Sequence, residues 1–505
     1  MSIFADLPGS LLDPFRKRSQ KGTTHSIDKL PIFFGGQNLP YDEATQHFLA
    51  VGTTGSGKTI MLRLLMQSAL IGIGRGDDTR ALVYDAKQDM MSILSAYCDP
   101  KLVRTTNPFD TRGVSWDLSK DVREPRVAVE IAYTLIPNEH ESQPFFSDAA
   151  RHIVFGVMVS FILSGHDWSL ADIARTLRSK RQVRQVLRRY PETRQIIGLY
   201  FYDKRLLANI MSTIASKMLR FEPIAAAWES AAESISLEEW TKSESILVLG
   251  NSETSRVAID AINRCMFKRA ADLTLSQTES FSRRSWFILD EVAEAGRLDG
   301  LVSLLKKGRS KGAAVVLALQ SVSGLRDQRM YGPHFTDEIL GQIGNRFFGR
   351  LECPATADWA SRLIGDQEVV QLSHSSTSSS HGSSSTTSRS SAIRRAILPS
   401  EFMSIPPTSR EDGVTGYFLL RREGCFLANF SGDTVFQDWL EPNLPSVPDF
   451  VPREITAQYL APWKGEQAAF FGIDLSRKPK KKRKRSTKRE NPKPSQADEV
   501  QDPFS

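Results

Sequence analysis

The chain has 505 residues, enough for two or three domains at roughly 150 residues each. Its composition, 40% hydrophobic and 24% charged, is ordinary for a soluble globular protein with a large core. The net charge of +7 lies in residues 477–505, which carry 11 Lys and Arg against 4 Asp and Glu, while the rest holds 54 of each sign. This distribution excludes a uniformly basic surface and confines the charge argument for polyanion binding to the tail.

The first predicted elements surround a glycine-rich loop. Residues 1–45 are punctuated by Pro and Gly and form an N-terminal segment. Phe48–Val51 is a short apolar run that predicts a strand, and residues 59–71 carry apolar side chains at helical spacing. Residues 81–85 predict a second buried strand. We therefore expect residues 46–123 to be the first part of an α/β domain.

Helical patterns with many Arg on their polar faces dominate residues 124–244, which predicts an all-helical insertion domain. The longest apolar run of the chain, residues 153–163, lies here. It is shorter than the about 20 residues that span a bilayer, so it predicts a buried helix. The sequence predicts no transmembrane segment and no signal peptide.

Strand and helix patterns alternate again over residues 245–441, the second part of the α/β domain. The predicted strands are 245–250, 285–289, 313–319, 346–351, 416–420 and 425–430, and the predicted helices are 255–274 and 298–307. Strands that alternate with helices indicate a mainly parallel sheet covered on both faces. The predicted fold class is therefore α/β with a mainly parallel sheet, interrupted by the all-helical domain.

Two segments have biased composition. Residues 373–391 contain 15 Ser or Thr in 19 positions, which predicts a flexible loop because such a stretch brings no core side chains. Residues 442–505 are Pro-rich and then basic, and we expect a disordered tail. The basic run 477–485 suits DNA phosphates or an anionic membrane surface, has the composition of a nuclear-localisation signal, and also fits a solvated tail without a partner.

The loop after the first predicted strand carries a nucleotide-binding motif, G-x-x-x-x-G-K-[ST]. Its residues are Gly52, Thr53, Thr54, Gly55, Ser56, Gly57, Lys58 and Thr59. Glycines let backbone N–H groups close around phosphate oxygens, and the start of the following helix adds partial positive charge. Lys58 would reach the β- and γ-phosphates, and the Thr59 hydroxyl would bind Mg²⁺. The motif predicts a P-loop that binds ATP, or a related nucleoside triphosphate, with Mg²⁺.

A pair of carboxylates follows the predicted strand 285–289. Asp290 would join the Mg²⁺ shell, and Glu291 would polarise the attacking water. A solvated acidic turn is the alternative for such a pair on its own. Together with the P-loop, the pair favours a hydrolysing enzyme over a slow switch.

Four further polar residues follow predicted strands or helices. Gln320 ends the strand 313–319 and could position water or sense hydrolysis. Arg309 could be an arginine finger, although a solvated basic turn explains it equally well. Asp85 and Lys87 follow the second strand, near the edge where such sheets bind ligands, and a salt-bridged strand end is the alternative.

Cysteine usage argues against a zinc site and for a reducing compartment. The four cysteines, Cys98, Cys265, Cys353 and Cys425, lie far apart and show no metal-ligand spacing.

Over residues 42–430 the sequence resembles the type IV coupling proteins, the TraG/TraD-type ATPases of bacterial conjugation and secretion. The stretches that carry the resemblance are the P-loop segment 47–59, the D-x-K strand end 83–87, the run 288–321, and the later blocks 352–365 and 395–406. Their combined order is far more specific than a P-loop alone.

The resemblance implies a RecA-like motor domain and a homo-hexameric ring that passes DNA or nucleoprotein toward a secretion apparatus. It gives Gln320 the sensor role and Arg309 the finger role, beside the roles argued above for the P-loop, Asp290 and Glu291. Family members usually begin with a membrane anchor, whereas only about 45 residues precede the P-loop strand here. We therefore expect a cytoplasmic protein, either from a soluble branch of the family or reaching the inner membrane through a partner.

The leading functional prediction is an ATP-driven DNA-translocating motor, the coupling protein of conjugation or type IV secretion, that delivers relaxosome or protein substrates to the secretion channel. One alternative is a DNA pump of the FtsK/HerA kind. Another is a recruitment platform that uses ATP only to assemble. Glu291 separates motor from platform, because a platform needs no hydrolytic base.

Overall fold

The computed structural model of the chain describes residues 30–137, 144–252, 255–379, 382–440, 447–454, 456 and 459–476. Most of the predicted N-terminal segment and the basic run 477–505 lie outside the described residues.

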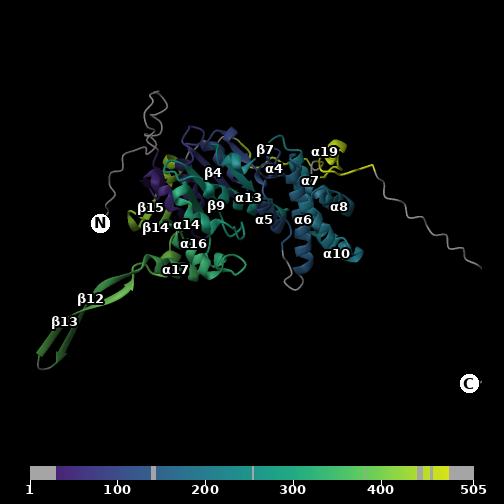
Figure 1. The fold of residues 1–505 in the computed structure, drawn as a ribbon. Helices are drawn as coiled ribbons and strands as arrows, with labels where there is room; N and C mark the ends of the chain where they lie inside the picture. Colours follow the sequence, from purple (N-terminus) through teal and green to yellow (C-terminus); the bar gives the residue numbers. More distant parts are fainter. Residues whose placement is uncertain are drawn as a thin grey trace, which may run out of the picture.

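A nine-stranded sheet forms the centre of the molecule, in the order β15-β14-β11-β3-β10-β9-β4-β8-β5 (Figure 1). Its strands are β3 (Phe48–Val51), β4 (Thr79–Asp85), β5 (Val103–Thr105), β8 (Ile246–Gly250), β9 (Arg284–Asp290), β10 (Ala313–Leu319), β11 (Asn345–Phe348), β14 (Val414–Leu420) and β15 (Gly424–Phe430). The strands from β11 to β5 pair in parallel, and β14 and β15 add an antiparallel edge. Every residue of β3, β4, β8, β9, β10 and β11 is buried, as expected of parallel strands covered on both faces. The predicted mainly parallel sheet is confirmed.

Successive side chains of β3 enter two different cores, one on each face of the sheet: Phe48 and Ala50 on one, Leu49 and Val51 on the other. The first core is closed by β1 (Ile32–Phe34), β2 (Gln37–Leu39), η1 (Tyr41–Gln46), α2 (Lys58–Ala69), α3 (Met90–Tyr97) and η2 (Pro100–Leu102). The second is closed by α13 (Arg256–Ser276), α14 (Leu301–Lys307), α15 (Val322–Arg326), α16 (Gly332–Gly341), α17 (Pro354–Ile364) and α18 (Pro399–Met403). The short η4 (Arg309–Lys311), which follows α14, contributes no buried residue.

The segment between β5 and β8 forms a helical region beside the sheet (Figure 1). It contains α4 (Leu118–Asp121), α5 (Pro125–Leu135), α6 (Pro144–Ser164), α7 (Leu170–Leu177), α8 (Lys180–Arg188), α9 (Pro191–Tyr200), α10 (Lys204–Met218), η3 (Leu219–Phe221), α11 (Glu222–Glu229) and α12 (Leu237–Trp240). Two short parallel strands, β6 (Ser115–Trp116) and β7 (Ser234–Ile235), join its beginning to its end, so the region is not purely helical. Its apolar side chains continue the second core.

The apolar run predicted as a buried helix lies in α6, which at 21 residues is longer than expected. Among the described residues, α6 is the one helix that is long and apolar enough to cross a membrane, with a mean hydropathy of 1.4. Most of this stretch is buried against neighbouring helices, and Arg151 within it donates hydrogen bonds to the Ile136 carbonyl and the Asp148 carboxylate, at 2.8 and 2.7 Å. The burial of α6 and the hydrogen bonds of Arg151 are those of a core helix in a folded domain.

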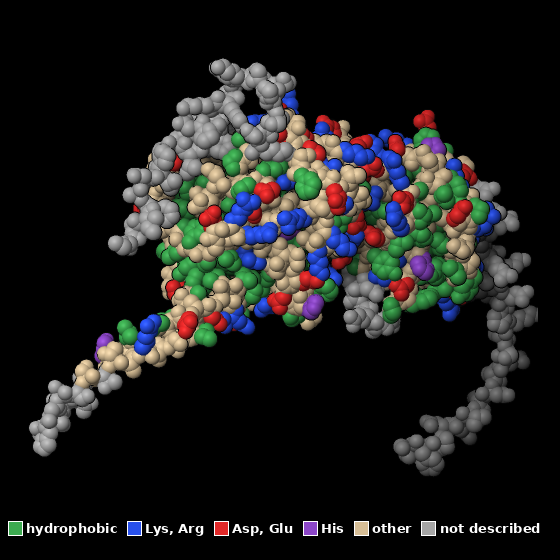
Figure 2. Space-filling view, turned by 60° about the vertical axis from the view of Figure 1, so that its left-hand side comes forward, with side chains coloured by type: hydrophobic (Ala, Val, Ile, Leu, Met, Phe, Trp, Pro, Cys, Tyr) green, Lys and Arg blue, Asp and Glu red, His purple; other side chains and the backbone are tan. Residues whose placement is uncertain are grey.

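The expectation of a loop over residues 373–391 is wrong in secondary structure. The strands β12 (Asp366–Ser379) and β13 (Gly382–Arg395) pair antiparallel, from Asp366 opposite Arg395 to Ser379 opposite Gly382. This hairpin projects from the body as an arm (Figure 1, Figure 2). A hairpin satisfies its backbone N–H and C=O groups across the pair, so it forms without core side chains.

The expectation of a disordered tail from residue 442 is also wrong for its described part. η5 (Thr434–Trp439) ends the sheet domain, and α19 (Gly465–Phe470) packs on the helical region. Arg175 donates to the Ala461 carbonyl at 2.7 Å, and Gln467 donates to Asp172 at 2.8 Å. Apolar side chains late in this segment are buried in the second core, among them Phe471 and Ile473. The Pro-rich composition gave no sign of this burial.

Candidate nucleotide site

The P-loop lies at the carboxyl edge of the parallel sheet, between the end of β3 and the start of α2. The Gly52 N–H donates to the Leu319 carbonyl of β10 at 3.2 Å, and the Thr53 N–H donates to the Arg350 carbonyl beyond β11 at 2.8 Å. The loop is therefore fixed by both strands that flank β3. The N-terminus of α2 faces outward at this edge, where an anion gains from its partial positive charge.

At two glycines of the loop a Cβ would clash with a neighbouring side chain. Gly57 has φ +87°, and a Cβ there would lie 2.8 Å from Val414 Cγ1. A Cβ on Gly52 would lie 2.2 Å from the Ser56 hydroxyl. Neighbouring side chains therefore pack directly against the backbone of the loop at these two glycines.

A pocket of about 400 Å³ opens over the P-loop. Its lining residues are Thr53, Thr54, Gly55, Ser56, Gly57, Lys58, Thr59, Ile60, Lys87, Glu291, Gln320, Thr408, Ser409, Arg410 and Phe436. The structure thus brings Glu291 and Gln320, more than 230 residues away in the chain, to the P-loop. Gly52, the first residue of the motif, is not among the lining residues, and its carbonyl accepts from Lys58.

Lys58 is held inside the loop. Its side chain is buried, and its ammonium donates to the Gly52 carbonyl and, at 3.0 Å, to the Thr53 carbonyl. Burial lowers the pKa of Lys58, and the nearby Glu291 carboxylate opposes that shift. The ammonium therefore lies where a phosphate group in the pocket could replace the carbonyls as its partner.

Asp290 ends β9 opposite Asp85 of β4, and the residue is 1% exposed. One carboxylate oxygen accepts from the Lys87 ammonium at 3.4 Å. The other, Oδ1, is buried without a hydrogen-bond partner among the described residues. An unpartnered buried carboxylate oxygen, with the Thr59 hydroxyl on the first turn of α2, fits Mg²⁺ bound by few protein ligands and by phosphate oxygens.

Glu291 adopts the left-handed conformation, with φ +70°. Such a conformation costs a non-glycine residue about 1–3 kcal/mol and is found disproportionately at functional sites. The Gln320 backbone N–H donates to Glu291 Oε1 at 3.3 Å, which orients the carboxylate at the pocket. The Gln320 side chain, at the end of β10, lines the same pocket.

Arg309 does not reach this pocket. It is exposed on η4, just before β10 begins, whereas Gln320 follows the end of the same strand. Seven residues of parallel strand at ~3.3 Å each put the two ends roughly 20 Å apart. Any contact between Arg309 and a nucleotide therefore involves the site of another subunit.

Asp85, which ends β4, and Lys87, which follows it, have different roles. Asp85 is buried and accepts from the backbone N–H groups of Asp89 and Met90, at 3.2 and 3.3 Å, at the start of α3. Burial raises its pKa to about 7, an effect strengthened by the neighbouring Asp89 carboxylate. Asp85 therefore anchors a helix, and Lys87 is the residue of the pair that reaches the site.

Four lining residues, Thr408, Ser409, Arg410 and Phe436, had no signal in the sequence. Thr408 and Arg410 lie in the loop before β14, where the Thr408 N–H donates to the Gly55 carbonyl at 2.8 Å. Phe436 comes from η5. Only the folding of β14 and β15 onto the edge of the sheet brings these residues to a loop some 350 positions earlier in the chain.

Comparison with known proteins agrees with this geometry. Residues 31–416 match the family described as the type IV secretion-system coupling protein DNA-binding domain. Coupling protein TraD of Escherichia coli (strain K12) is 24% identical over 366 residues, which cover 71% of this chain and 48% of TraD. Conjugal transfer protein TraG of Rhizobium radiobacter is 27% identical over 149 residues, 30% of this chain and 22% of TraG. The chain thus spans about half the length of TraD.

Solved structures share the fold. The bacterial conjugative coupling protein TrwBdeltaN70, in its unbound monoclinic form, superposes with a TM-score of 0.63 and 20% identity, over 85% of this chain and 93% of that one. Plasmid coupling protein TrwB in complex with ADP and Mg²⁺ gives 0.62 and 19%, over 88% and 97%. These likenesses confirm the predicted RecA-like domain interrupted by a helical one. Because the family match runs from the start of β1 into β14 and contains the whole P-loop, the chain belongs to the type IV secretion-system coupling protein family.

Proposed function

We propose that the chain is an ATP-driven motor that moves DNA, and that it serves as the coupling protein of conjugation or type IV secretion. The observation that carries the proposal is the position of Glu291, whose carboxylate is oriented by the Gln320 N–H in a pocket shared with the P-loop. A hydrolytic base in that position suits repeated turnover. Membership of a coupling protein family supplies the link to DNA.

Nucleotide binding is the first step of the proposed function. TrwB is known in complex with ADP and Mg²⁺ and with the ATP analogue ADPNP. In this chain the P-loop N–H groups and Lys58 would bind the phosphates, with Lys58 exchanging its carbonyl partners for phosphate oxygens. Thr59 and Asp290 would hold Mg²⁺. When bound, the metal neutralises charge that develops on the phosphate oxygens.

Hydrolysis then depends on Glu291. Its carboxylate accepts a proton from water that attacks the γ-phosphorus, while the bond from that phosphorus to the bridging oxygen breaks and ADP leaves. The Gln320 amide, beside Glu291, would respond to the presence or absence of the γ-phosphate. Arg309 of a neighbouring subunit would stabilise the transition state, which requires a ring, and we propose a homo-hexamer.

The proposed partners follow from the family. DNA is the moved substrate, delivered as a relaxosome nucleoprotein or with secreted proteins to the type IV secretion apparatus. We place the protein in the cytoplasm, at the inner membrane through a partner.

The two alternatives, a FtsK/HerA-like pump and a platform that uses ATP only to assemble, differ in testable ways, because a platform needs neither Glu291 nor stimulation by DNA.

ATP turnover measured with and without single- and double-stranded DNA tests the proposal. We expect DNA to stimulate turnover of the wild type severalfold, and Lys58→Ala and Thr59→Ala to abolish turnover, since both residues face the phosphates or the metal. Wild-type turnover in either variant would overturn the P-loop assignment. Turnover indifferent to both kinds of DNA would favour the platform.

A further inference from the structure

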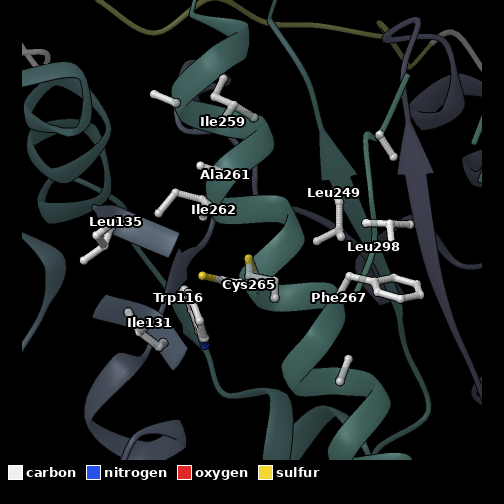
Figure 3. Packing of buried hydrophobic residues seen from close by; sticks show 14 of the residues in the cluster. Trp116, Ile131, Leu135, Leu249, Ile259, Ala261, Ile262, Cys265, Phe267 and Leu298 are labelled. Carbon is white, nitrogen blue, oxygen red and sulfur yellow. The ribbon is translucent and has the colours of Figure 1, made fainter. Parts of the chain in front are cut away.

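A second concave surface lies between the helical region and the sheet domain, away from the P-loop. It is a groove of about 630 Å³ between α5 and α13, two helices that pack on each other, and we refer to it as the basic groove. Its floor is apolar, with Ile131 from α5 and Ala261 from α13. Figure 3 shows Ile131 and Leu135 of α5 on one side of α13 and Leu298 on its other side.

The rim of the groove is strongly cationic. The five cationic residues that line it are Arg220, Arg264, Lys268, Arg269 and Arg297. The lining carboxylates are Glu130 and Asp299. Outside residues 477–505 the chain has equal numbers of acidic and basic residues, so this local excess is not a reflection of overall charge. A concentration of guanidinium groups in a concave surface favours a polyanionic ligand.

Two of the arginines have no ion-pair partner among the described residues, although Arg264 interacts electrostatically with Asp260 and Arg269 with Glu238. Lys268 pairs with Asp272 and lies 3.8 Å from Glu130. Arg264 and Arg269, by contrast, form no ion pair with any residue that the structure describes, and Arg269 Nε is buried without an acceptor. A buried N–H group without an acceptor is costly unless a ligand supplies one. Phosphate oxygens suit a guanidinium fork in both charge and geometry.

An aromatic side chain stands beside these arginines. Tyr133 lines the groove and is 55% exposed, although a large apolar ring usually gains by burial. The guanidinium of Arg151 lies 4.4 Å from the ring centroid and stiffens it by a cation–π contact. An ordered, exposed ring among arginines is typical of surfaces that bind single-stranded nucleic acid, where bases stack and cations follow the phosphates.

The groove is connected to the catalytic carboxylate through the backbone. Glu291 is followed by a loop that reaches the groove at Arg297 and Asp299. An ion pair between Glu294 of this loop and Arg256 ties the loop to the first turn of α13. A ligand in the groove therefore contacts the segment that continues directly into Glu291.

We propose that the basic groove binds a segment of single-stranded DNA, with Arg264 and Arg269 on its phosphates and Tyr133 against a base, and that its occupancy stimulates hydrolysis through the loop after Glu291. This inference rests on the proposed DNA-dependent motor function. An acidic peptide would satisfy the arginines, but it offers no base to stack on Tyr133.

The test compares two double variants of the full chain, Arg264→Ala/Arg269→Ala and the control Arg188→Ala/Arg205→Ala. The control removes the same charge from exposed arginines of α8 and α10 that have no ion pair in the described residues. Binding of oligo-dT is measured against salt concentration. The groove variant should lower the slope of log K against log salt by about 1.4, at ~0.7 per lost phosphate contact, and should lose most of the DNA stimulation of turnover. The control should behave as the wild type.

Tyr133 provides an independent readout. Tyr133→Ala should weaken oligo-dT binding about tenfold or more, since a stacked base contributes roughly 1–3 kcal/mol, whereas Tyr133→Phe should retain it. An unchanged salt slope in the groove variant overturns the inference. The inference is also overturned if a polyglutamate peptide loses affinity for this variant while oligo-dT does not, because the groove is then a peptide site. Failure of the wild type to bind any DNA overturns the proposed motor function itself.

Discussion

Glu291 is the residue on which the proposed chemistry depends. It follows a fully buried strand in a left-handed conformation, and a backbone N–H of the neighbouring strand end orients its carboxylate. The next carboxylate along the loop, Glu294, is instead paired with Arg256 at the surface. The two residues thus have the same chemistry in different surroundings.

Glu291→Gln should reduce ATP turnover by about 10²–10⁴-fold, because the amide cannot accept the proton of the attacking water. Affinity for Mg-nucleotide should change little, since Lys58, Thr59 and Asp290 remain. Glu294→Gln is the matched control and should leave the turnover measured without DNA near the wild-type rate. Equal turnover in both variants would remove Glu291 from the chemistry.

His47 illustrates a residue that stabilises the fold around the site. Its buried ring accepts from the Val315 N–H at Nδ1 and donates from Nε2 to the Leu305 carbonyl, at 3.1 and 3.2 Å. Burial lowers the pKa of His47 to about 4, and the charge of Arg309 acts in the same direction. A lowered pKa means that the unfolded chain binds the proton more readily, so stability is lost as the pH falls from about 6.5 to about 4.

The free energy of unfolding should therefore fall by about 3 kcal/mol over that pH range on account of His47 alone. In His47→Asn, whose amide oxygen can still accept from Val315, this contribution should be absent. Urea denaturation of both proteins at pH 7 and pH 4 measures the difference. Parallel pH dependence in the two proteins would show that His47 does not titrate as described.

At the scale of elements, the arm formed by β12 and β13 is the clearest candidate for removal. Its described side chains are mostly exposed, including the apolar Leu372 and Ile393, and its strands contact mainly each other. Isolated two-stranded hairpins are marginal in water, so the arm should contribute little to the stability of the body.

Replacing residues 370–391 by a short Gly-Ser turn should shift the melting temperature of the body by only a few degrees. A mild protease should also cut the wild-type chain first within these residues. A large drop in melting temperature on deletion, or first cleavage within the sheet domain or the helical region, would mean that the arm packs on the body. Deleting residues 459–476 is the contrasting experiment and should be strongly destabilising, because that segment buries Phe471 and Ile473.

Some parts of the site and the fold could be predicted from the sequence, and others could not. The P-loop, Asp290 and Glu291 were predictable because each motif is continuous in the chain and follows an apolar strand. Arg410 and Phe436 were not, since long-range pairing of β14 and β15 delivers them to the pocket. Two predictions from composition were wrong. The Ser- and Thr-rich stretch forms a hairpin, because backbone hydrogen bonds between its strands need no core side chains. The Pro-rich segment is ordered, because a few aromatic and aliphatic side chains within it are buried.

At the scale of the whole molecule, Arg309 requires more than one chain. It lies at the opposite edge of the sheet from its own pocket, so we propose that it completes the site of a neighbour. Arg309→Ala should lower turnover by up to about 10³–10⁵-fold, the range found for arginine fingers supplied in trans, with nucleotide affinity nearly unchanged. Lys307→Ala, which removes an exposed charge two residues earlier, is the control.

Mixing Arg309→Ala with Lys58→Ala subunits gives the sharper result. Each intact Lys58 site can then meet an intact Arg309 from its neighbour, so activity should partly return. If mixtures that demonstrably co-assemble stay as inactive as the separate variants, Arg309 is an ordinary basic turn.

The motor claim is tested most directly by DNA translocation, measured as displacement of a third strand from a triplex by the assembled protein. We expect displacement with ATP, none with ADPNP, and none by Glu291→Gln, even where that variant binds the same DNA. Rings that hydrolyse ATP at a DNA-stimulated rate yet never displace the third strand would contradict translocation.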